Sequence, residues 1–284
     1  MGNQCAESCL HYHRLGLWLQ VGGLRGRSPW EREFQEVWRK EQWFLRQYEE
    51  MAETALERKV SELAPERLMG TLHGAFEKAF ALVFEKGSGI IQKAGRQEVR
   101  RKVYQANAAA VDLCEDRSGL KAFSRAAGQA GAGNLAVSGL AGVGMGFFGV
   151  ALPDIPLFTA LLLKSVYETA ESYGFPCQGE AERLYALRVI EAALSRGVEL
   201  REKSRELDRY AQTGVWTEET GRDAQIKATA RRLSEAVLYG KALQSVPVVG
   251  AVGGAGDAVC LRRVQRYADI KYHKRFLMGR RRAE

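Results

Sequence analysis

Residues 126–152 read AAGQAGAGNLAVSGLAGVGMGFFGVAL, and none of these 27 residues carries a charge. The stretch contains seven glycines between positions 131 and 149. In a helix, four of them would share one face, because their spacings of 3, 4 and 3 match the helical repeat. These four are Gly139, Gly142, Gly146 and Gly149. Seven helical glycines cost roughly 6 kcal/mol relative to alanine. We therefore expect a second helix backbone to pack closely against this face.

Two interpretations of this glycine-rich stretch remain open. One is a tightly packed hairpin inside a water-soluble bundle, and the other is insertion into, or close association with, a membrane. A third interpretation, a nucleotide loop, rests on residues 144–149, which match the pattern G-x-G-x-x-G. That motif requires a preceding strand and a long following helix, whereas Pro153 and Pro156 interrupt the chain soon afterwards. We therefore reject a dinucleotide site and expect no cofactor.

A similar arrangement returns near the C-terminus. Residues 242–248 (ALQSVPV) parallel residues 151–157 (ALPDIPL), with Ala-Leu, two linking residues, a β-branched residue, proline and an apolar residue. Each segment precedes a stretch with little charge, and the second stretch carries Gly250 and Gly254. The pattern predicts two proline-started helices with small faces that pack together, and chance similarity is the alternative. The helix-start motifs comprise Pro153, Asp154, Pro156, Ser245 and Pro247.

The composition favours an all-α fold. The 284 residues are enough for one large domain with a sizeable core. The chain contains only six prolines and lacks runs of β-branched residues that alternate with polar ones. The five cysteines are scattered and odd in number, which argues against a disulfide framework and for a reducing compartment. Residues 1–28 differ from the rest of the chain, and we expect a loose segment there.

Local signals predict where individual helices begin and end. Ser28-Pro29 with Glu31 forms a capping box, which predicts a helix from residue 29 to about 63. Trp38 and Trp43 widen its apolar stripe, as core residues or as an interfacial anchor. A second helix is expected over residues 65–86 and is expected to break at Gly87-Ser88-Gly89. Further helices are expected over about 90–109, from Asp154 to about Tyr173, and over 181–196 and 223–243. Gly174 is expected as a helix cap, residues 197–210 as a solvated helix or connector, and 216–221 as a loop.

The positive charge is concentrated at the C-terminal end. Residues 262–284 contain nine lysines and arginines and two acidic residues, a net charge of +7 out of +8 for the whole chain. The high pI is therefore a property of this end and not a nucleic-acid signature of the whole protein. We expect the basic end to bind an anionic membrane surface, and a solvated helix that binds nothing is the alternative. The candidate anion-binding residues are Lys274, Arg275, Arg280, Arg281 and Arg282.

Several of these motifs together resemble the EcsC protein family. The resemblance rests on Leu152-Pro153-Asp154-Ile155-Pro156, on Tyr173-Gly174-Phe175 with Glu182, on residues 244–253 (QSVPVVGAVG), and on Tyr267-Ala268 through Tyr272 to Arg275-Phe276-Leu277. It extends from Pro29 to about Leu277. The family takes its name from a component associated with an ABC transporter. The resemblance implies no catalytic activity, so it supplies no catalytic residue.

The sequence itself also lacks the common motifs of catalytic sites. The sequence contains no G-x-S-x-G nucleophile motif and no phosphate-binding loop of the form G-x-x-x-x-G-K-[ST]. Glu180 and Glu182 are two residues apart at an expected helix start, where carboxylates suit the helix dipole. We therefore predict no catalytic, cofactor-binding or metal-binding residues.

The predicted architecture is an all-α multi-helix bundle built around two glycine-rich, proline-started helical hairpins. We expect a loose segment at residues 1–28, a single helical domain at 29–279 and a basic tail at 280–284. The expected function is that of a non-enzymatic cytoplasmic protein, peripheral to the inner face of the membrane. Its partner would be an anionic membrane surface or a membrane protein complex, and nucleic acid is not expected. One alternative is a ligand-binding protein or enzyme that uses the glycine-rich groove as an apolar pocket. The other is a purely cytosolic helical adaptor.

Overall fold

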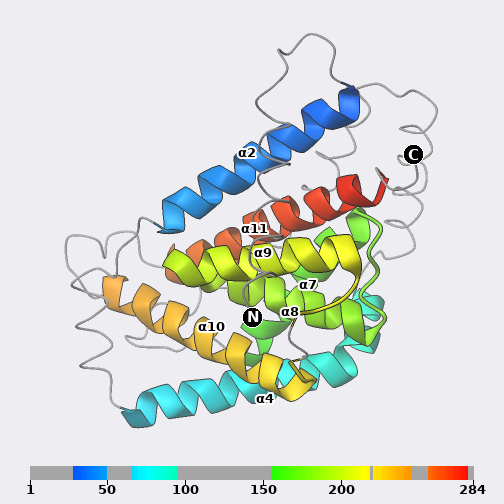
Figure 1. The fold of residues 1–284 in the computed structure, drawn as a ribbon. Coiled ribbons are helices and arrows are strands. Elements are labelled where there is room, and N and C mark those ends of the chain that lie inside the picture. Colours follow the sequence, from blue (N-terminus) through cyan, green and yellow to red (C-terminus); the bar gives the residue numbers. More distant parts are fainter. Residues whose placement is uncertain (1–27, 50–65, 95–154, 218–219, 245–254, 281–284) are drawn as a thin grey trace, which may run out of the picture.

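The computed structural model describes residues 28–49, 66–94, 155–217, 220–244 and 255–280, and within these ranges it contains helices and no strands. Figure 1 shows their arrangement. The helices are α2 (Pro29–Glu49), α4 (Glu66–Ala94), α7 (Ile155–Ser172), α8 (Glu180–Leu194), α9 (Gly197–Thr213), α10 (Arg222–Gln244) and α11 (Ala255–Arg280). The expectation of an all-α multi-helix bundle is therefore confirmed. The glycine-rich stretches, at 126–152 and around 250, lie outside the described residues.

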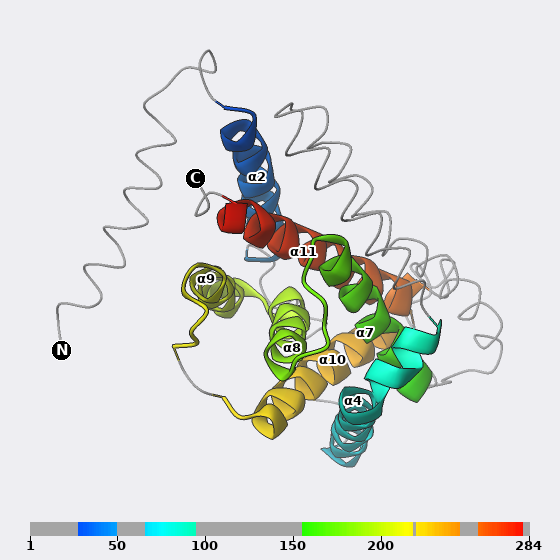
Figure 2. The same cartoon turned by 90° about the vertical axis from the view of Figure 1, so that its right-hand side faces the viewer.

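Helix α8 lies at the centre of the bundle. All ten residues from Tyr185 to Leu194 are buried, and α8 packs against α7, α9, α10 and α11. Helix α11 is the second central element, because it packs against α2, α7, α8, α9 and α10. Helix α4 forms an outer layer on α7 and α10, while α2 lies at the opposite edge of the molecule, against α11 and α9 (Figures 1 and 2).

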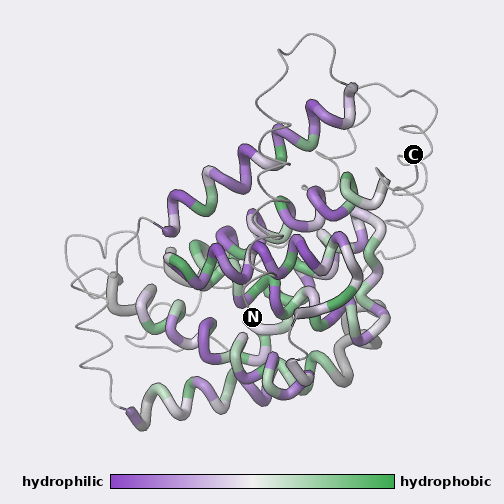
Figure 3. The backbone as a smooth tube through the Cα atoms, in the orientation of Figure 1, coloured by the Kyte–Doolittle hydropathy of each residue, from purple (hydrophilic) through white to green (hydrophobic). Residues whose placement is uncertain are grey.

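Helix α2 differs from the central helices in the character of its buried face. Its buried residues are Glu33, Val37, Glu41, Phe44 and Leu45, so two of the five are acidic. Coloured by hydropathy, α2 is mostly hydrophilic with short hydrophobic stretches (Figure 3). Helix α2 therefore attaches to the bundle through charged as well as apolar side chains.

Two helix ends agree with the sequence at the level of single hydrogen bonds. At the start of α2, the Glu31 backbone N–H donates to Ser28 Oγ (3.2 Å) and the Ser28 N–H donates to Glu31 Oε2 (3.0 Å). This is the predicted capping box. At the end of α7, Gly174 has φ +87°, its N–H donates to Glu171 O, and the Phe175 N–H donates to Ala170 O. These two bonds form a Schellman motif around the predicted cap.

The structure corrects two expectations about helices. The predicted break at Gly87-Ser88-Gly89 is wrong, because α4 continues to Ala94. Each helical glycine costs about 1 kcal/mol, which weakens a helix but does not stop it without a proline or a capping residue. Helix α9 is not simply solvated, since Leu200, Leu207 and Asp208 are buried. The expected start of α7 is confirmed in part: Pro156 lies in its first turn, but Asp154 lies outside the described residues, as do residues 50–65 after α2.

Candidate functional site

A cluster of four buried charges joins α2, α9 and α11. We call Glu41, Ser204, Asp208, Lys271 and Lys274 the Glu41 cluster. The Lys271 Nζ donates to Glu41 Oε1 (2.7 Å) and Asp208 Oδ1 (2.6 Å), and the Lys274 Nζ donates to Asp208 Oδ2 (2.6 Å) and to Glu41 Oε2. All four charged side chains are at most 8% exposed. Helical spacing produces this geometry, because Lys271 and Lys274 are three residues apart and Ser204 and Asp208 are four apart.

Ser204 completes the hydrogen bonding of the cluster. Its hydroxyl donates to Glu41 Oε1 (3.0 Å), and both its hydroxyl and its backbone carbonyl accept from the Lys271 Nζ (3.0 and 2.9 Å). Buried charges are costly unless they are paired and hydrogen-bonded. In this cluster both cations and both carboxylates have partners, so the charges are compensated where water is excluded.

In two members of the cluster the neighbouring charges shift the pKa in favour of the charged form. Burial alone would raise the pKa of Glu41, but Lys271 and Lys274 lower it to about 2. Burial opposes the charged form of Lys271, but Asp208 and Glu41 outweigh it and raise the lysine pKa well above its usual value. Glu41 and Lys271 therefore stay charged at neutral pH, and Lys271 is not a base there.

A second buried group is His273, which lies between Lys271 and Lys274 in α11 and approaches Glu33 of α2. The ring of His273 stacks on Tyr173 with ring centres 5.2 Å apart, and the Tyr173 hydroxyl donates to Asp269 Oδ1 (2.8 Å). Burial, assisted by Lys40, lowers the pKa of His273 to about 3. The ring is therefore neutral at neutral pH, and its 3.7 Å approach to Glu33 is not an ion pair.

Arg275 occupies an aromatic enclosure. Its guanidinium makes a two-pronged ion pair with Glu182 (2.8 and 2.5 Å). The rings of Phe175, Tyr185 and Tyr210 lie 4.2, 4.5 and 5.4 Å from its central carbon. A bidentate pair against aromatic faces is a strong arrangement for arginine. Glu182 lies in the first turn of α8 as predicted, and its ion pair with Arg275 is a role that the sequence pattern did not indicate.

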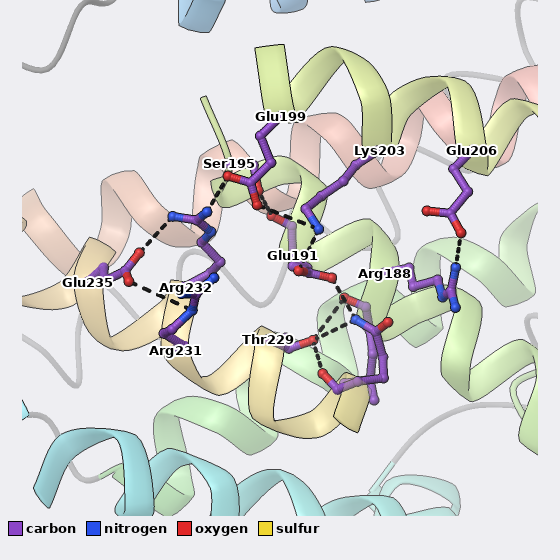
Figure 4. Close-up of polar contacts among 12 residues, drawn as sticks. Arg188, Glu191, Ser195, Glu199, Lys203, Glu206, Thr229, Arg231, Arg232 and Glu235 are labelled. Carbon is purple, nitrogen blue, oxygen red and sulfur yellow. Dashed lines mark hydrogen bonds and ion pairs between the residues drawn. The ribbon is translucent and has the colours of Figure 1, made fainter. Parts of the chain in front are cut away.

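A polar network covers the junction of α8, α9 and α10 (Figure 4). Glu191 accepts from Lys203 Nζ and from Gln225 Nε2, both at 2.7 Å. Arg188 pairs with Glu206 and lies 3.9 Å over the Trp216 ring. A cavity of about 200 Å³ lies beside these groups and is also lined by Leu207, Thr220 and Ala228. Its two cations and two carboxylates are already paired with one another, so the cavity carries no unbalanced charge to select a ligand.

The outer face of α2 presents arginine and tryptophan. Arg32, Arg39 and Arg46 are seven residues apart, so they form a nearly straight row along the helix. Arg39 and Arg46 are exposed and Arg32 is half-buried. Trp43 is 50% exposed beside this row, and Trp38 is 36% exposed on its other side. Arg266 of α11 lies 4.0 Å over the Trp43 ring, which adds a further exposed arginine to the surface. The expectation of a core role for the two tryptophans is therefore wrong, because both rings reach solvent.

The structure also corrects two of the predicted anion-binding residues. Lys274 and Arg275 are not surface cations, because Lys274 is buried against Glu41 and Asp208 and Arg275 is paired with Glu182. Arg280 is the last residue of α11, and Arg281 and Arg282 lie outside the described residues. The predicted packing glycines and most of the predicted helix-start residues also lie outside the described residues. They are Gly139, Gly142, Gly146, Gly149, Gly250, Gly254, Pro153, Asp154, Ser245 and Pro247.

Within the described ranges, no helix is long and apolar enough to cross a membrane. The same residues contain no group of three or more histidine, cysteine or acidic side chains that could hold a metal ion.

These features define a class of protein: an all-α bundle whose edge helix is held by buried ion pairs and carries a basic, tryptophan-containing outer face. The chain belongs to the EcsC protein family, whose family model matches residues 30–277. No curated protein and no solved structure matches the chain. The match covers all the described helices except the ends of α2 and α11, so the Glu41 cluster lies inside the family region.

Proposed function

We propose that this protein is a non-enzymatic, cytoplasmic-side protein that binds anionic membrane surfaces through the outer face of α2 and the basic end of the chain. The observation that carries the proposal is the combination on α2 of the row Arg32, Arg39 and Arg46 with the exposed rings of Trp38 and Trp43. Tryptophan is enriched where protein meets the headgroup region, and arginine is attracted to anionic headgroups.

The energetics of this surface suit reversible binding. Each lysine or arginine near an anionic membrane surface contributes about 1 kcal/mol. Arg39, Arg46 and Arg266 are exposed together with Trp43, so this surface contributes roughly 3 kcal/mol of electrostatic attraction. Stable attachment generally needs a second signal in addition to one basic patch. The arginine triplet at residues 280–282 is the proposed second signal.

Co-sedimentation with vesicles tests the proposal. Replacing Arg39 and Arg46 with glutamine removes about 2 kcal/mol, so binding to phosphatidylglycerol-containing vesicles should weaken by roughly 30-fold. The matched control replaces Lys227 and Arg231 of α10 with glutamine. These side chains are 66% and 56% exposed, and α10 lies away from α2 (Figure 1).

The control should bind like the unchanged chain, because it removes the same charge from a different surface. Equal weakening by both double variants would indicate that net charge alone drives binding. Equal binding to phosphatidylcholine vesicles in high salt would exclude the electrostatic mechanism altogether.

A further inference from the structure

The Glu41 cluster has two parts: four side chains from α9 and α11, which we call the host, and Glu41 from α2. Lys271 and Lys274 belong to α11, and Ser204 and Asp208 belong to α9. These two helices pack against each other and both pack against α8, so their four side chains belong to one continuous part of the bundle. The edge helix α2 supplies only Glu41.

The host groups converge on one carboxylate. Glu41 Oε1 accepts from the Lys271 Nζ (2.7 Å) and the Ser204 hydroxyl (3.0 Å), and Oε2 accepts from the Lys274 Nζ. Three donors from two helices therefore surround the two oxygens of a single carboxylate. This is the arrangement of a carboxylate-binding site whose ligand is part of the same chain.

The charge of the host selects the kind of ligand. With Glu41 present, two ammonium groups face two carboxylates. Without Glu41, Asp208 is the one carboxylate among the described residues that pairs with Lys271 and Lys274, and these three groups have a net charge of +1. A group with one negative charge restores neutrality, so a carboxylate suits the host better than a dianion such as phosphate.

Helix α2 attaches to the bundle through apolar as well as charged contacts. Val37, Phe44 and Leu45 are buried, and Trp30, Phe34 and Tyr48 are partly buried against the core. Helix α2 also lies at the edge of the bundle (Figures 1 and 2). The contacts of Glu41 therefore add the buried charged part of the attachment to this apolar and aromatic packing.

We propose that Lys271, Lys274 and Ser204 form a carboxylate-binding site, that Glu41 is its built-in ligand, and that a carboxylate from outside the chain displaces α2 by taking the place of Glu41. A ligand that binds only the open state shifts the equilibrium toward that state. Helix α2 then leaves its position against α9 and α11 when such a ligand binds. The proposal is independent of lipid binding by the outer face of α2.

The first experiment removes the built-in ligand from the full-length chain. Glu41→Ala should lower the melting temperature, and formate should restore most of the loss in a saturable way relative to chloride at equal ionic strength. Adding Ser204→Ala should weaken the restoration, because it removes one donor to the carboxylate. The matched control is Glu36→Ala on the same helix, where the side chain is 30% exposed and 3.6 Å from Lys40. Formate should not stabilise that control, and equal stabilisation of both variants overturns the site.

The second experiment uses the unchanged chain, so it does not depend on whether Glu41→Ala folds. Acetate, compared with chloride at equal ionic strength, should increase amide hydrogen exchange in α2 and leave exchange in α8 unchanged. Exchange in α2 that is the same in acetate and chloride, or that rises equally in α2 and α8, overturns the displacement.

Discussion

The ring of His273 is 2% exposed and stacked on Tyr173, in surroundings that disfavour a charged imidazole. Burial and the charge of Lys40 lower its pKa to about 3, against a usual value of 6.5. In the unfolded chain the ring becomes protonated below pH 6.5, while in the folded chain it stays neutral down to about pH 3. His273 therefore favours folding above pH 6.5, and this contribution is lost as the pH falls toward 3.

We expect the free energy of unfolding to fall between pH 6.5 and 4.5 by up to 1.4 kcal/mol per pH unit, roughly 2–3 kcal/mol over the window. His273→Gln has no titrating ring and should show a flatter profile in the same window. Urea denaturation at several pH values measures both slopes. Glu41, whose pKa is lowered from 4.5 to about 2, loses its contribution only below pH 4.5, so the two effects separate. Parallel profiles for the two proteins would contradict this assignment.

The apolar pattern of α2 does not reveal that one residue on its buried face, Glu41, is charged and paired. The apolar stripe of α2 is predictable from Phe34, Val37 and Phe44, but Glu41 falls on the same stripe and is buried with them. A charged residue on an apolar stripe is a sign of a buried ion pair. Its partners are 163 to 233 residues away along the chain. No local pattern could identify Ser204, Lys271 and Lys274 as those partners, so this part of the candidate site required the structure.

At the scale of helices, the ends that depend on local hydrogen bonds were predictable. The capping box of α2 and the glycine cap of α7 involve residues within five positions of each other. The course of α4 through Gly87 and Gly89 was not predictable, because glycine alone only weakens a helix. The buried face of α9 was hidden by its many charged residues, of which Asp208 points into the bundle.

Substitutions at two glycines can test the effect of backbone conformation on stability separately from the effect of packing. Gly214 caps α9 with φ +73°, while Gly74 lies inside α4, and an added methyl group would meet nothing within 4 Å at either position. Gly214→Ala should destabilise the protein by about 1–2 kcal/mol, because alanine is strained in the left-handed region. Gly74→Ala should stabilise it by up to about 1 kcal/mol, because alanine favours a helix.

Chemical denaturation of both variants measures the two changes. Effects of the same sign would show that contacts or the unfolded state, and not backbone conformation, dominate at these positions.

At the scale of the whole molecule, composition was sufficient to predict an all-α bundle, but not how the charge is distributed in it. The C-terminal net charge of +7 suggested one basic surface. In the structure, Lys271 and Lys274 are buried and Arg275 is part-buried in an ion pair. Which side chains of α11 are buried depends on the helices that pack around it, and five helices do so. A count of charges therefore overstates the basic surface that α11 can present.

This distribution predicts opposite outcomes for two sets of C-terminal substitutions. Replacing Lys274 and Arg275 with glutamine should destabilise the fold, because Glu41, Asp208 and Glu182 each lose a buried partner. Breaking one buried pair costs about 3–5 kcal/mol. Replacing Arg280, Arg281 and Arg282 should leave the melting temperature unchanged but weaken binding to anionic vesicles. At about 1 kcal/mol per arginine, that weakening is roughly a hundredfold.

Thermal denaturation and vesicle co-sedimentation, performed on both variants, measure the two effects separately. The 280–282 variant is the informative one for membrane binding, because the 274–275 variant changes folding and binding together. A loss of stability in the 280–282 variant would mean that these arginines, too, are used inside the fold. Unchanged sedimentation with unchanged stability would contradict the role proposed for residues 280–282. Of the two proposed surfaces, the outer face of α2 would then remain, and the Arg39 and Arg46 substitutions would have to account for its salt-sensitive binding.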